Sequence, residues 1–206
     1  MPQESLPIPR SNIYRLLSLG FRYPSYSVFK TFQSGEFSLE LEENISILPH
    51  IREMEKALFV NNITFSEFEI KFVETFDTGS PLPPCPPYEG FYIEPRTAVM
   101  LEISEFYRHF GLAMSQKEGK REFPDHISAE LEFLHFLTFQ ETQAPENIRE
   151  YLLAQKDFLE RHLLRWVPEF CNRLRNSGTP FYVRLAHVTS VFLACEHEFV
   201  ASKLRN

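Results

Sequence analysis

Apolar residues recur at helical spacing along most of the chain. Phe68, Phe72 and Phe76 lie four residues apart, so their rings fall on one face of a helix. Thr64 and Glu67 precede them in the Thr-x-x-Glu arrangement of a capping box, which places the start of this helix just after Thr64. No segment shows a convincing alternation of apolar and polar residues, which a half-buried strand requires. The pattern therefore predicts an all-α protein.

Caps and prolines set the expected limits of the other helices. Ser11 suits the N-cap of the first helix, Pro95 the first turn of a central one, and Gly111 the end of that central helix. Pro49 should break or kink a helix, and Pro168 should begin a short one. The expected helices cover residues 11–20, 26–32, 40–60, 64–76, 95–110, 124–142, 145–164, 168–176 and 181–204. This order predicts about eight to ten helices.

A proline-rich segment divides this helical pattern at residues 77–90. Five prolines and two glycines fall within it, a density that neither a helix nor a central strand tolerates. The segment leads into Tyr88, Glu89, Phe91 and Tyr92. Two interpretations are open. The segment is either a rigid connector whose rings pack on the core, or a loop that presents its rings to an apolar peptide and Glu89 to a cation.

Composition narrows the class of protein. The chain has 206 residues and 43% hydrophobic content, which suits one globular domain at residues 11–206 after a flexible polar segment at residues 1–10. Its 21 phenylalanines raise the expectation of an aromatic-lined groove beside the core. A net charge of −7 argues against nucleic acid as the main partner, because phosphate contacts need clustered lysines and arginines. The same charge suits a basic peptide.

Cysteine usage and the N-terminal residues indicate the compartment. Cys85, Cys171 and Cys195 are odd in number and form no Cys-x-x-Cys pair, which is typical of free thiols in a reducing compartment. Residues 1–10 lack the basic and apolar regions of a signal peptide, and no run approaches 18 apolar residues. We therefore expect a cytoplasmic protein without stable membrane insertion.

The helix expected after Pro124 gathers the densest set of chemically active side chains. His126 and Glu130 lie four residues apart on one face, and Asp125 stands at the helix start, where a carboxylate can cap free N–H groups. A purely structural interpretation makes Asp125 the cap and the glutamates a solvated face.

Metal binding is a second interpretation of the same helix. Glu132 and His135 form a Glu-x-x-His motif of the kind that di-iron carboxylate bundles use. Such a site needs a second copy of the motif, and the chain has only this one. A di-metal enzyme built on Glu132 and His135 stays an alternative. The chain has no Gly-x-Ser-x-Gly turn or glycine-rich phosphate loop that would favour other catalytic chemistry.

Three segments together resemble the TorD/DmsD/NarJ-type chaperones, which mature molybdenum-cofactor oxidoreductases. Residues 122–133 carry Pro-Asp-His followed by Glu-Leu-Glu-Phe, the signature of that family. Residues 87–92 are similar to its Tyr-Glu-Ser-x-Tyr segment, with Gly90 in place of the serine. Residues 158–186 follow the apolar spacing of the family's scaffold, including its Trp-Pro-Phe order. The resemblance covers residues 11–200.

The resemblance implies an all-helical chaperone rather than an enzyme, with no cofactor of its own, present as a monomer or a domain-swapped dimer. The implied partner is the apo form of a molybdoenzyme catalytic subunit, bound through a twin-arginine signal peptide or another segment. The chaperone would assist cofactor insertion before export or membrane docking. The Tyr-Glu-Gly-Phe-Tyr form is similar to the branch that serves nitrate reductase-like enzymes. A structural helical adaptor is a further alternative.

The residues expected to bind the client come from the two motifs and one neighbour. They are Tyr88, Glu89, Phe91, Tyr92, Arg96, Pro124, Asp125, His126 and Glu130. Asp125, Glu130 and Glu89 are expected to form an acidic rim that attracts arginines, beside a groove of phenylalanine and tyrosine rings. Arg96 is expected to fix the loop through a carboxylate, and Asp125 with His126 to form the functional centre.

Overall fold

The structure is a computed structural model that describes residues 6–51, 58, 60, 62–114, 122–177 and 179–205. The helices are α1 (Pro7–Phe21), α2 (Tyr26–Ser34), α3 (Glu36–Ile47), α4 (Phe65–Phe76), α5 (Arg96–His109), α6 (Ile127–Gln143), α7 (Ile148–Phe158), α8 (Leu164–Ser177) and α9 (Pro180–Arg205). Shorter turns are η2 (Glu89–Phe91), η3 (Pro145–Asn147) and η4 (Leu159–Leu163). Within the described residues there is one isolated β-bridge and no strand, which confirms the all-α prediction.

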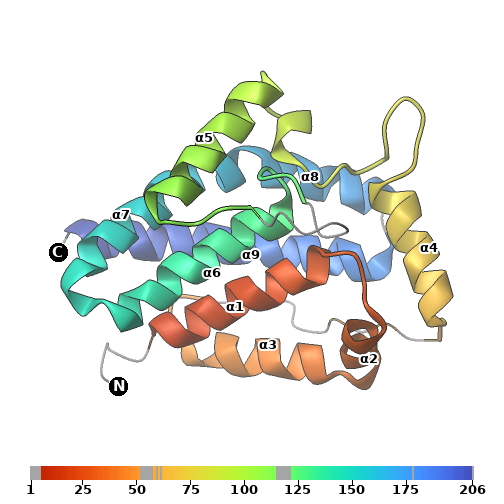
Figure 1. The fold of residues 1–206 in the computed structure, drawn as a ribbon. Coiled ribbons are helices and arrows are strands. Elements are labelled where there is room, and N and C mark those ends of the chain that lie inside the picture. Colours follow the sequence, from red (N-terminus) through yellow and green to blue (C-terminus); the bar gives the residue numbers. More distant parts are fainter. Residues whose placement is uncertain are drawn as a thin grey trace.

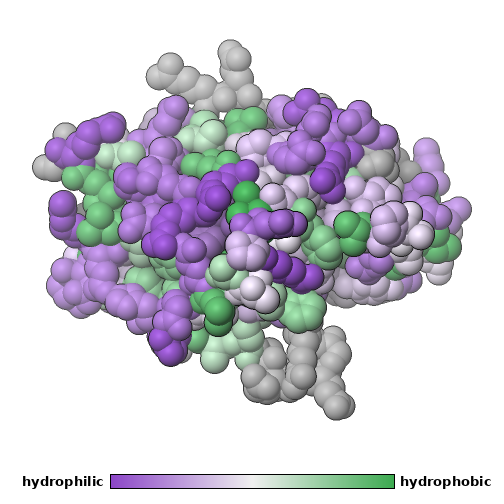
Figure 2. Space-filling view, turned by 90° about the horizontal axis from the view of Figure 1, so that it is seen from above, coloured by the Kyte–Doolittle hydropathy of each residue, from purple (hydrophilic) through white to green (hydrophobic). Residues whose placement is uncertain are grey.

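Helices α1 and α6 lie side by side, run in opposite directions and form a central layer around which the other helices pack (Figure 1). Helix α3 covers the other side of α1, and α9 runs behind both, packed against α7 and α8. Helix α5 and the proline-rich loop lie across the top of this layer. Seen from that side, the surface is mostly hydrophilic, with separate apolar patches (Figure 2). No helix in the described part of the chain has both the length and the apolar character needed to cross a membrane.

Aromatic rings fill much of the core, as the phenylalanine content suggested. The predicted face of α4 is confirmed, since Phe68, Phe72 and Phe76 are all buried. Phe68 packs against Phe181 and Tyr182 of α9 at ring-centroid distances of 5.6 and 5.5 Å. The first pair is edge-to-face and the second is stacked, and both geometries add to the free energy gained by burying the rings.

Several predicted helix boundaries are confirmed. The capping box of α4 is present, with Thr64 Oγ1 accepting from the Glu67 amide at 3.3 Å and Glu67 accepting from the Thr64 amide at 2.6 Å. Gly111 follows α5 with a φ of 73°, a conformation that glycine adopts without strain. Helix α5 itself begins at Arg96, directly after Pro95.

The N-terminal boundary differs from the prediction. Helix α1 begins at Pro7 and not after Ser11, so residues 7–10 of the expected flexible segment are helical. Proline suits the first turn of a helix, and Arg10 is held there by buried partners described below. Ser11 is buried and donates to the His135 carbonyl oxygen instead of capping a helix. Residues 1–5 lie outside the described residues.

The two expectations about prolines have different outcomes. Helix α3 runs from Glu36 to Ile47 and ends two residues before Pro49, which confirms the predicted break, although the helix begins earlier than the expected residue 40; residues 52–57 and 59 of the expected 40–60 range lie outside the described part. Pro168 does not begin a helix but lies inside α8. Trp166, Val167 and Phe170 around it are buried, and their packing holds the helix through the position where proline removes a hydrogen bond.

Candidate functional site

The motifs at residues 87–92 and 122–133 meet in space, where the proline-rich loop contacts the start of α6. Tyr88 lies opposite His126 in an antiparallel bridge. The Glu89 amide donates to the Asp125 carbonyl at 2.8 Å, and the Ile127 amide donates to the Pro87 carbonyl at 2.9 Å. These bonds join segments that lie 35 or more residues apart in the chain. We call this region the loop–α6 junction.

His126, and not Asp125, is the N-cap of α6. Its ring Nδ1 accepts from the Ser128 amide at 3.1 Å and lies 2.7 Å from Ser128 Oγ. Burial lowers the pKa of His126 to about 3, and the charge of Arg22 acts in the same direction. The ring is therefore neutral at physiological pH, with its hydrogen on Nε2, which faces the Glu122 carboxylate at 3.6 Å. The alternative, purely structural interpretation that makes Asp125 the cap is therefore wrong.

Asp125 is buried and points back into the loop. Its Oδ2 accepts from the Gly90 amide at 3.2 Å and lies 3.4 Å from Arg96 Nε. Burial raises the pKa of Asp125, while Arg96 opposes this rise. A side chain at Gly90 would not fit, because its Cβ would lie 2.2 Å from Arg96 Cγ and 2.9 Å from Asp125 Oδ2. The close approach of Arg96 and Asp125 thus explains why glycine, which has no side chain, occupies position 90.

Arg96 lies on the outer side of the loop–α6 junction. It forms the expected ion pair with a carboxylate, which is that of Asp125. Its guanidinium lies over the rings of Phe91, Phe123 and Tyr88, at 4.8, 5.2 and 5.5 Å from their centroids. A cation over aromatic faces is attracted by the ring quadrupoles. Phe123 is exposed, so this aromatic cage for a guanidinium reaches the molecular surface.

The expected acidic rim is not at the surface. Asp125, Glu130 and Glu89 are all fully buried. Glu89 Oε2 lies 3.0 Å from His162 Nδ1, and Glu130 Oε2 accepts from Trp166 Nε1 at 3.2 Å. Burying a charged group is costly unless it is paired, which is why each carboxylate has a donor from a neighbouring element. The rim expectation is wrong because tertiary partners that the sequence does not reveal draw these side chains inward.

Sequence reasoning missed two of these partners, His162 and Trp166. His162 belongs to the π-turn η4, and Trp166 follows in α8. In the sequence, Trp166 stands out only through the Trp-Pro-Phe order, and no motif singles out His162. Such π-turns occur frequently at functional sites, but no sequence signal marks this one.

The junction also concentrates carboxylate oxygens that have no hydrogen-bond partner in the described protein. They are Glu89 Oε1, Asp125 Oδ1 and Glu130 Oε1. Burial, followed by repulsion from Glu89, raises the pKa of Glu130 well above its ordinary value. This environment therefore favours the protonated, neutral form of Glu130. Chemically, the cluster can hold a proton and position the loop, but its carboxylates cannot touch a partner in this conformation.

Tyr92 also faces inward. Its hydroxyl donates to the Pro86 carbonyl at 3.0 Å, and its ring lies 5.2 Å from that of Trp166. Pro124 contributes its carbonyl oxygen, which accepts from the Tyr107 hydroxyl at 2.9 Å. Both residues are thus part of the packing that holds the loop in place.

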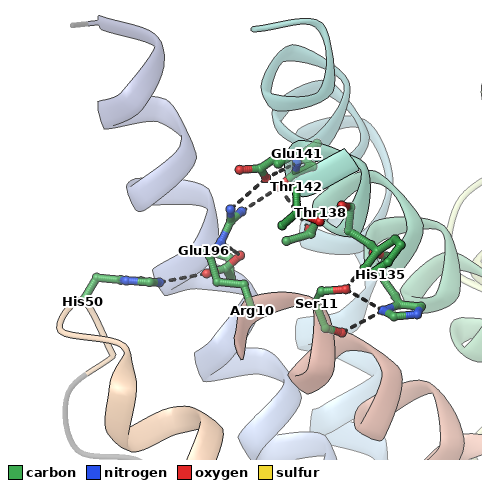
Figure 3. A network of polar contacts seen from close by, with 10 residues as sticks. Arg10, Ser11, His50, His135, Thr138, Glu141, Thr142 and Glu196 are labelled. Carbon is green, nitrogen blue, oxygen red and sulfur yellow. Dashed lines mark hydrogen bonds and ion pairs between the residues drawn. The ribbon is translucent and has the colours of Figure 1, made fainter. Parts of the chain in front are cut away.

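The metal interpretation of the same helix is not supported. Glu132 is exposed and pairs with Arg22, whereas the His135 ring lies 2.7 Å from Ser11 Oγ (Figure 3). The two side chains therefore face different partners. Across the described residues, no group of three or more histidine, cysteine, aspartate or glutamate side chains is arranged to hold a metal ion.

A second buried network fastens the N-terminal helix to the rest of the fold (Figure 3). Arg10 donates to Glu141 and Glu196, each at 2.8 Å, and to Gln155 at 2.6 Å. Burial alone would lower the pKa of Arg10, but the charges of Glu196 and Glu141 raise it. His50 Nε2 lies 2.8 Å from the second oxygen of Glu196. The network joins α1 to α6, α7 and α9.

A groove of about 890 Å³ opens between α1, α2 and α6, away from the buried carboxylates. Its apolar walls are formed by Leu19, Val28, Met114, Phe133, Phe136 and Phe139. Its polar lining includes Arg22, Glu122 and Glu132. We call this feature the α1–α2–α6 groove. Its phenylalanine rings match the aromatic groove that the composition predicts. None of the residues predicted to bind the client lines it.

Comparison with known proteins places the chain in a family. The family model described as nitrate reductase delta subunit matches residues 47–172. A perchlorate reductase assembly chaperone protein from Dechloromonas aromatica (strain RCB) is 31% identical over 97% of this chain and 93% of its own. A selenate reductase assembly chaperone protein from Thauera selenatis is 33% identical over 63% of this chain and 69% of its own.

A solved structure has the same fold. The crystal structure of a proposed redox enzyme maturation protein from Archaeoglobus fulgidus superposes with a TM-score of 0.51, covering 93% of each chain at 22% identity. At that identity the likeness concerns the fold alone. The sequence matches carry the assignment: this chain belongs to the nitrate reductase delta subunit family, the TorD/DmsD/NarJ-type chaperones of redox enzyme maturation.

Proposed function

We propose that this protein is an assembly chaperone for the catalytic subunit of a molybdenum-cofactor oxidoreductase. The observation that carries the proposal is the similarity, along 97% of the chain, to a perchlorate reductase assembly chaperone. Relatives with partial coverage are named for the assembly of selenate and chlorate reductases. These names describe assembly factors and not enzymes, and the described residues offer a binding groove and a buried polar cluster instead of a metal site.

The chaperone acts on the apo form of the catalytic subunit. It binds the twin-arginine signal peptide or another N-terminal segment, keeps the subunit competent for cofactor insertion, and delays export or membrane docking until insertion is complete. Insertion into an exported enzyme precedes transport, so the chaperone works in the cytoplasm. A net charge of −7 supports a basic client segment.

Under this proposal, some of the predicted site residues contact the client and the others support the contact surface. Tyr88, Phe91 and Arg96 are only partly buried, so they can contact the client at the surface, together with exposed Phe123. The other predicted residues hold this surface from behind. They are Glu89, Tyr92, Pro124, Asp125, His126 and Glu130.

The test is co-expression of the tagged chaperone with the reductase catalytic subunit encoded in the neighbouring reading frame. Co-purification is compared between cells that make the molybdenum cofactor and cells blocked in its synthesis. The proposal predicts capture of the catalytic subunit, with more captured when the cofactor is missing. Capture of neither form by correctly folded chaperone would contradict it.

A double variant tests whether the exposed aromatic rings belong to the contact surface. Phe91→Ala with Phe123→Ala is expected to weaken capture several-fold, because it removes two rings of the cage around Arg96. Leu101→Ala is the control, since Leu101 is an exposed apolar residue on α5 outside the cage. Equal capture by the double variant and the control would remove these rings from the contact surface.

A further inference from the structure

His162 lies between the loop of residues 87–92 and helix α5, and it is buried. Its ring Nδ1 lies 3.0 Å from Glu89 Oε2, and its Nε2 lies 3.6 Å from Glu102 Oε1. Because an ionised carboxylate can only accept hydrogen bonds, Nδ1 is the donor in the contact with Glu89. One imidazole ring thus faces a carboxylate of the loop and a carboxylate of α5.

The π-turn η4 places His162 in a buried row of aromatic rings that recur every four residues. The row consists of Phe158, His162, Trp166 and Phe170, none of which is more than 1% exposed. In a regular helix of 3.6 residues per turn, residues spaced by four drift around the axis by about 40° per step. The π-turn holds one extra residue and offsets most of the drift that accumulates over three steps. It therefore keeps His162 in line with Trp166, on the side that faces the loop–α6 junction.

Arg161, the preceding residue of the same π-turn, anchors α5. Its guanidinium pairs with Glu102 Oε1 and lies 5.5 Å from the centroid of the Phe106 ring. The His162 ring meets the same Phe106 ring edge-on at 5.6 Å. These contacts fix the position of α5 on the π-turn. The Nδ1 contact of His162 then adds the loop that precedes α5 to this anchor.

Glu89 depends on His162 for its place in the interior. The Glu89 side chain is fully buried, and its Oε1 has no hydrogen-bond partner among the described residues. Loss of the donor at Oε2 would leave an uncompensated buried carboxylate, which is costly and favours movement of the group toward water. Glu89 directly follows Tyr88 and lies in the turn η2 with Phe91. An outward movement of Glu89 would therefore displace both rings.

We propose that His162 is a positioning residue of the client-contact surface, which holds Tyr88 and Phe91 in place through the bond from its Nδ1 to Glu89. The inference rests on the proposed function, in which these two rings contact the client. His162 is buried and does not itself touch the client. It acts on binding through the loop, across 73 positions of sequence.

Two amide substitutions separate the two ring nitrogens of His162. The side-chain nitrogen of asparagine can take the place of Nδ1, and that of the longer glutamine the place of Nε2. His162→Asn should therefore keep the bond to Glu89 and capture the reductase catalytic subunit nearly as well as the wild type. His162→Gln and His162→Phe lose the donor to Glu89 and should weaken capture several-fold. The dissociation constant is measured by surface plasmon resonance, with catalytic subunit from cells blocked in cofactor synthesis.

A double-mutant cycle tests whether His162 acts through Glu89. Glu89→Leu should weaken capture several-fold, and His162→Phe combined with Glu89→Leu should be no worse than the weaker single variant. Urea unfolding of each variant identifies the conditions under which all of them are folded, and capture is compared there. His197→Phe is the matched control, because His197 of α9 pairs at 2.6 Å with Glu160 of the same π-turn. This control should capture like the wild type.

The outcomes separate this inference from the proposed function. Failure of the wild type to capture the catalytic subunit contradicts the proposed function itself. If the wild type captures the subunit and His162→Phe and His162→Gln capture it equally well, His162 is not a positioning residue, and the chaperone function stands. Equal weakening by the asparagine, glutamine and phenylalanine variants, or additive losses in the cycle, would show that His162 only fills space, which also overturns the inference.

Discussion

At the scale of single residues, Glu130 shows how the loop–α6 junction responds to pH. Burial raises the pKa of its carboxyl group well above the ordinary value of 4.5, and repulsion from Glu89 adds to this rise. In the unfolded chain the group titrates near its ordinary value. Above that pH the folded state therefore binds more protons than the unfolded state. The contribution of Glu130 to stability is complete below about pH 4.5 and declines as pH rises toward the folded pKa.

Replacing Glu130 with Gln, which resembles the protonated acid, should remove this decline. We expect Glu130→Gln to gain stability relative to the wild type as pH rises from 5 to 8, by at most about 1.4 kcal/mol per pH unit for one proton. Urea unfolding at several pH values measures the difference. Glu132→Gln on the exposed side of α6 is the control and should show no such trend. A difference for Glu130→Gln that does not change with pH would contradict the assignment.

Arg10 is the other residue whose environment makes a sharp prediction. Its guanidinium lies between two buried carboxylates, Glu141 and Glu196. Removing one member of a buried ion network leaves uncompensated charge, so Arg10→Met should lower the free energy of unfolding by about 3–5 kcal/mol. Arg15→Met on the same helix removes only a partly exposed pair with Glu40 and should cost less than about 1 kcal/mol. Denaturant titration measures both, and equal losses would contradict the role of Arg10.

At the scale of elements, the proline-rich loop and the start of α6 are joined by main-chain hydrogen bonds. Gly90 permits this approach, because Arg96 and Asp125 occupy the space where a Cβ would stand. His126 then caps α6 with its ring. The surface formed by Tyr88 and Phe91 depends on this arrangement, since both belong to the loop that the junction fixes.

The junction should open when a methyl group is added at Gly90. We expect Gly90→Ala to cost about 1–3 kcal/mol, the usual range for overpacking. Hydrogen exchange should locate the effect, with faster exchange of the Glu89 and Ile127 amides than in the wild type. The amide of Phe68 in α4, far along the chain, is an internal reference. Unchanged protection at Glu89 and Ile127 would show that the loop tolerates a side chain there.

The sequence predicted those elements whose signals are local. The capping box at Thr64 and the phenylalanine face of α4 depend on residues within one or two turns, and both are confirmed. The predictions that Pro168 begins a helix and that Ser11 caps one were wrong, because burial of neighbouring residues outweighed the usual preferences of proline and serine for helix starts. The family resemblance indicated which residues belong to the site, but it did not reveal how these residues are arranged in space. Glu89 meets His162 across 73 positions of sequence, and no local pattern records such a contact.

At the scale of the whole molecule, two buried polar networks support one groove-bearing surface. The Arg10 network holds α1 against α6, which lie side by side (Figure 1). Residues of both helices line the α1–α2–α6 groove. The junction holds the aromatic loop at the other end of α6. The molecule thus combines a rigid frame, partly exposed aromatic rings and a groove whose polar lining includes Arg22, Glu122 and Glu132.

The most direct measurement of the central claim is the molybdenum content of the reductase catalytic subunit, purified from cells that contain or lack this protein. The account predicts a full complement of molybdenum with the chaperone and a clearly substoichiometric amount without it, restored by supplying the wild-type chain. Equal molybdenum content and equal reductase activity in the two strains would contradict the account.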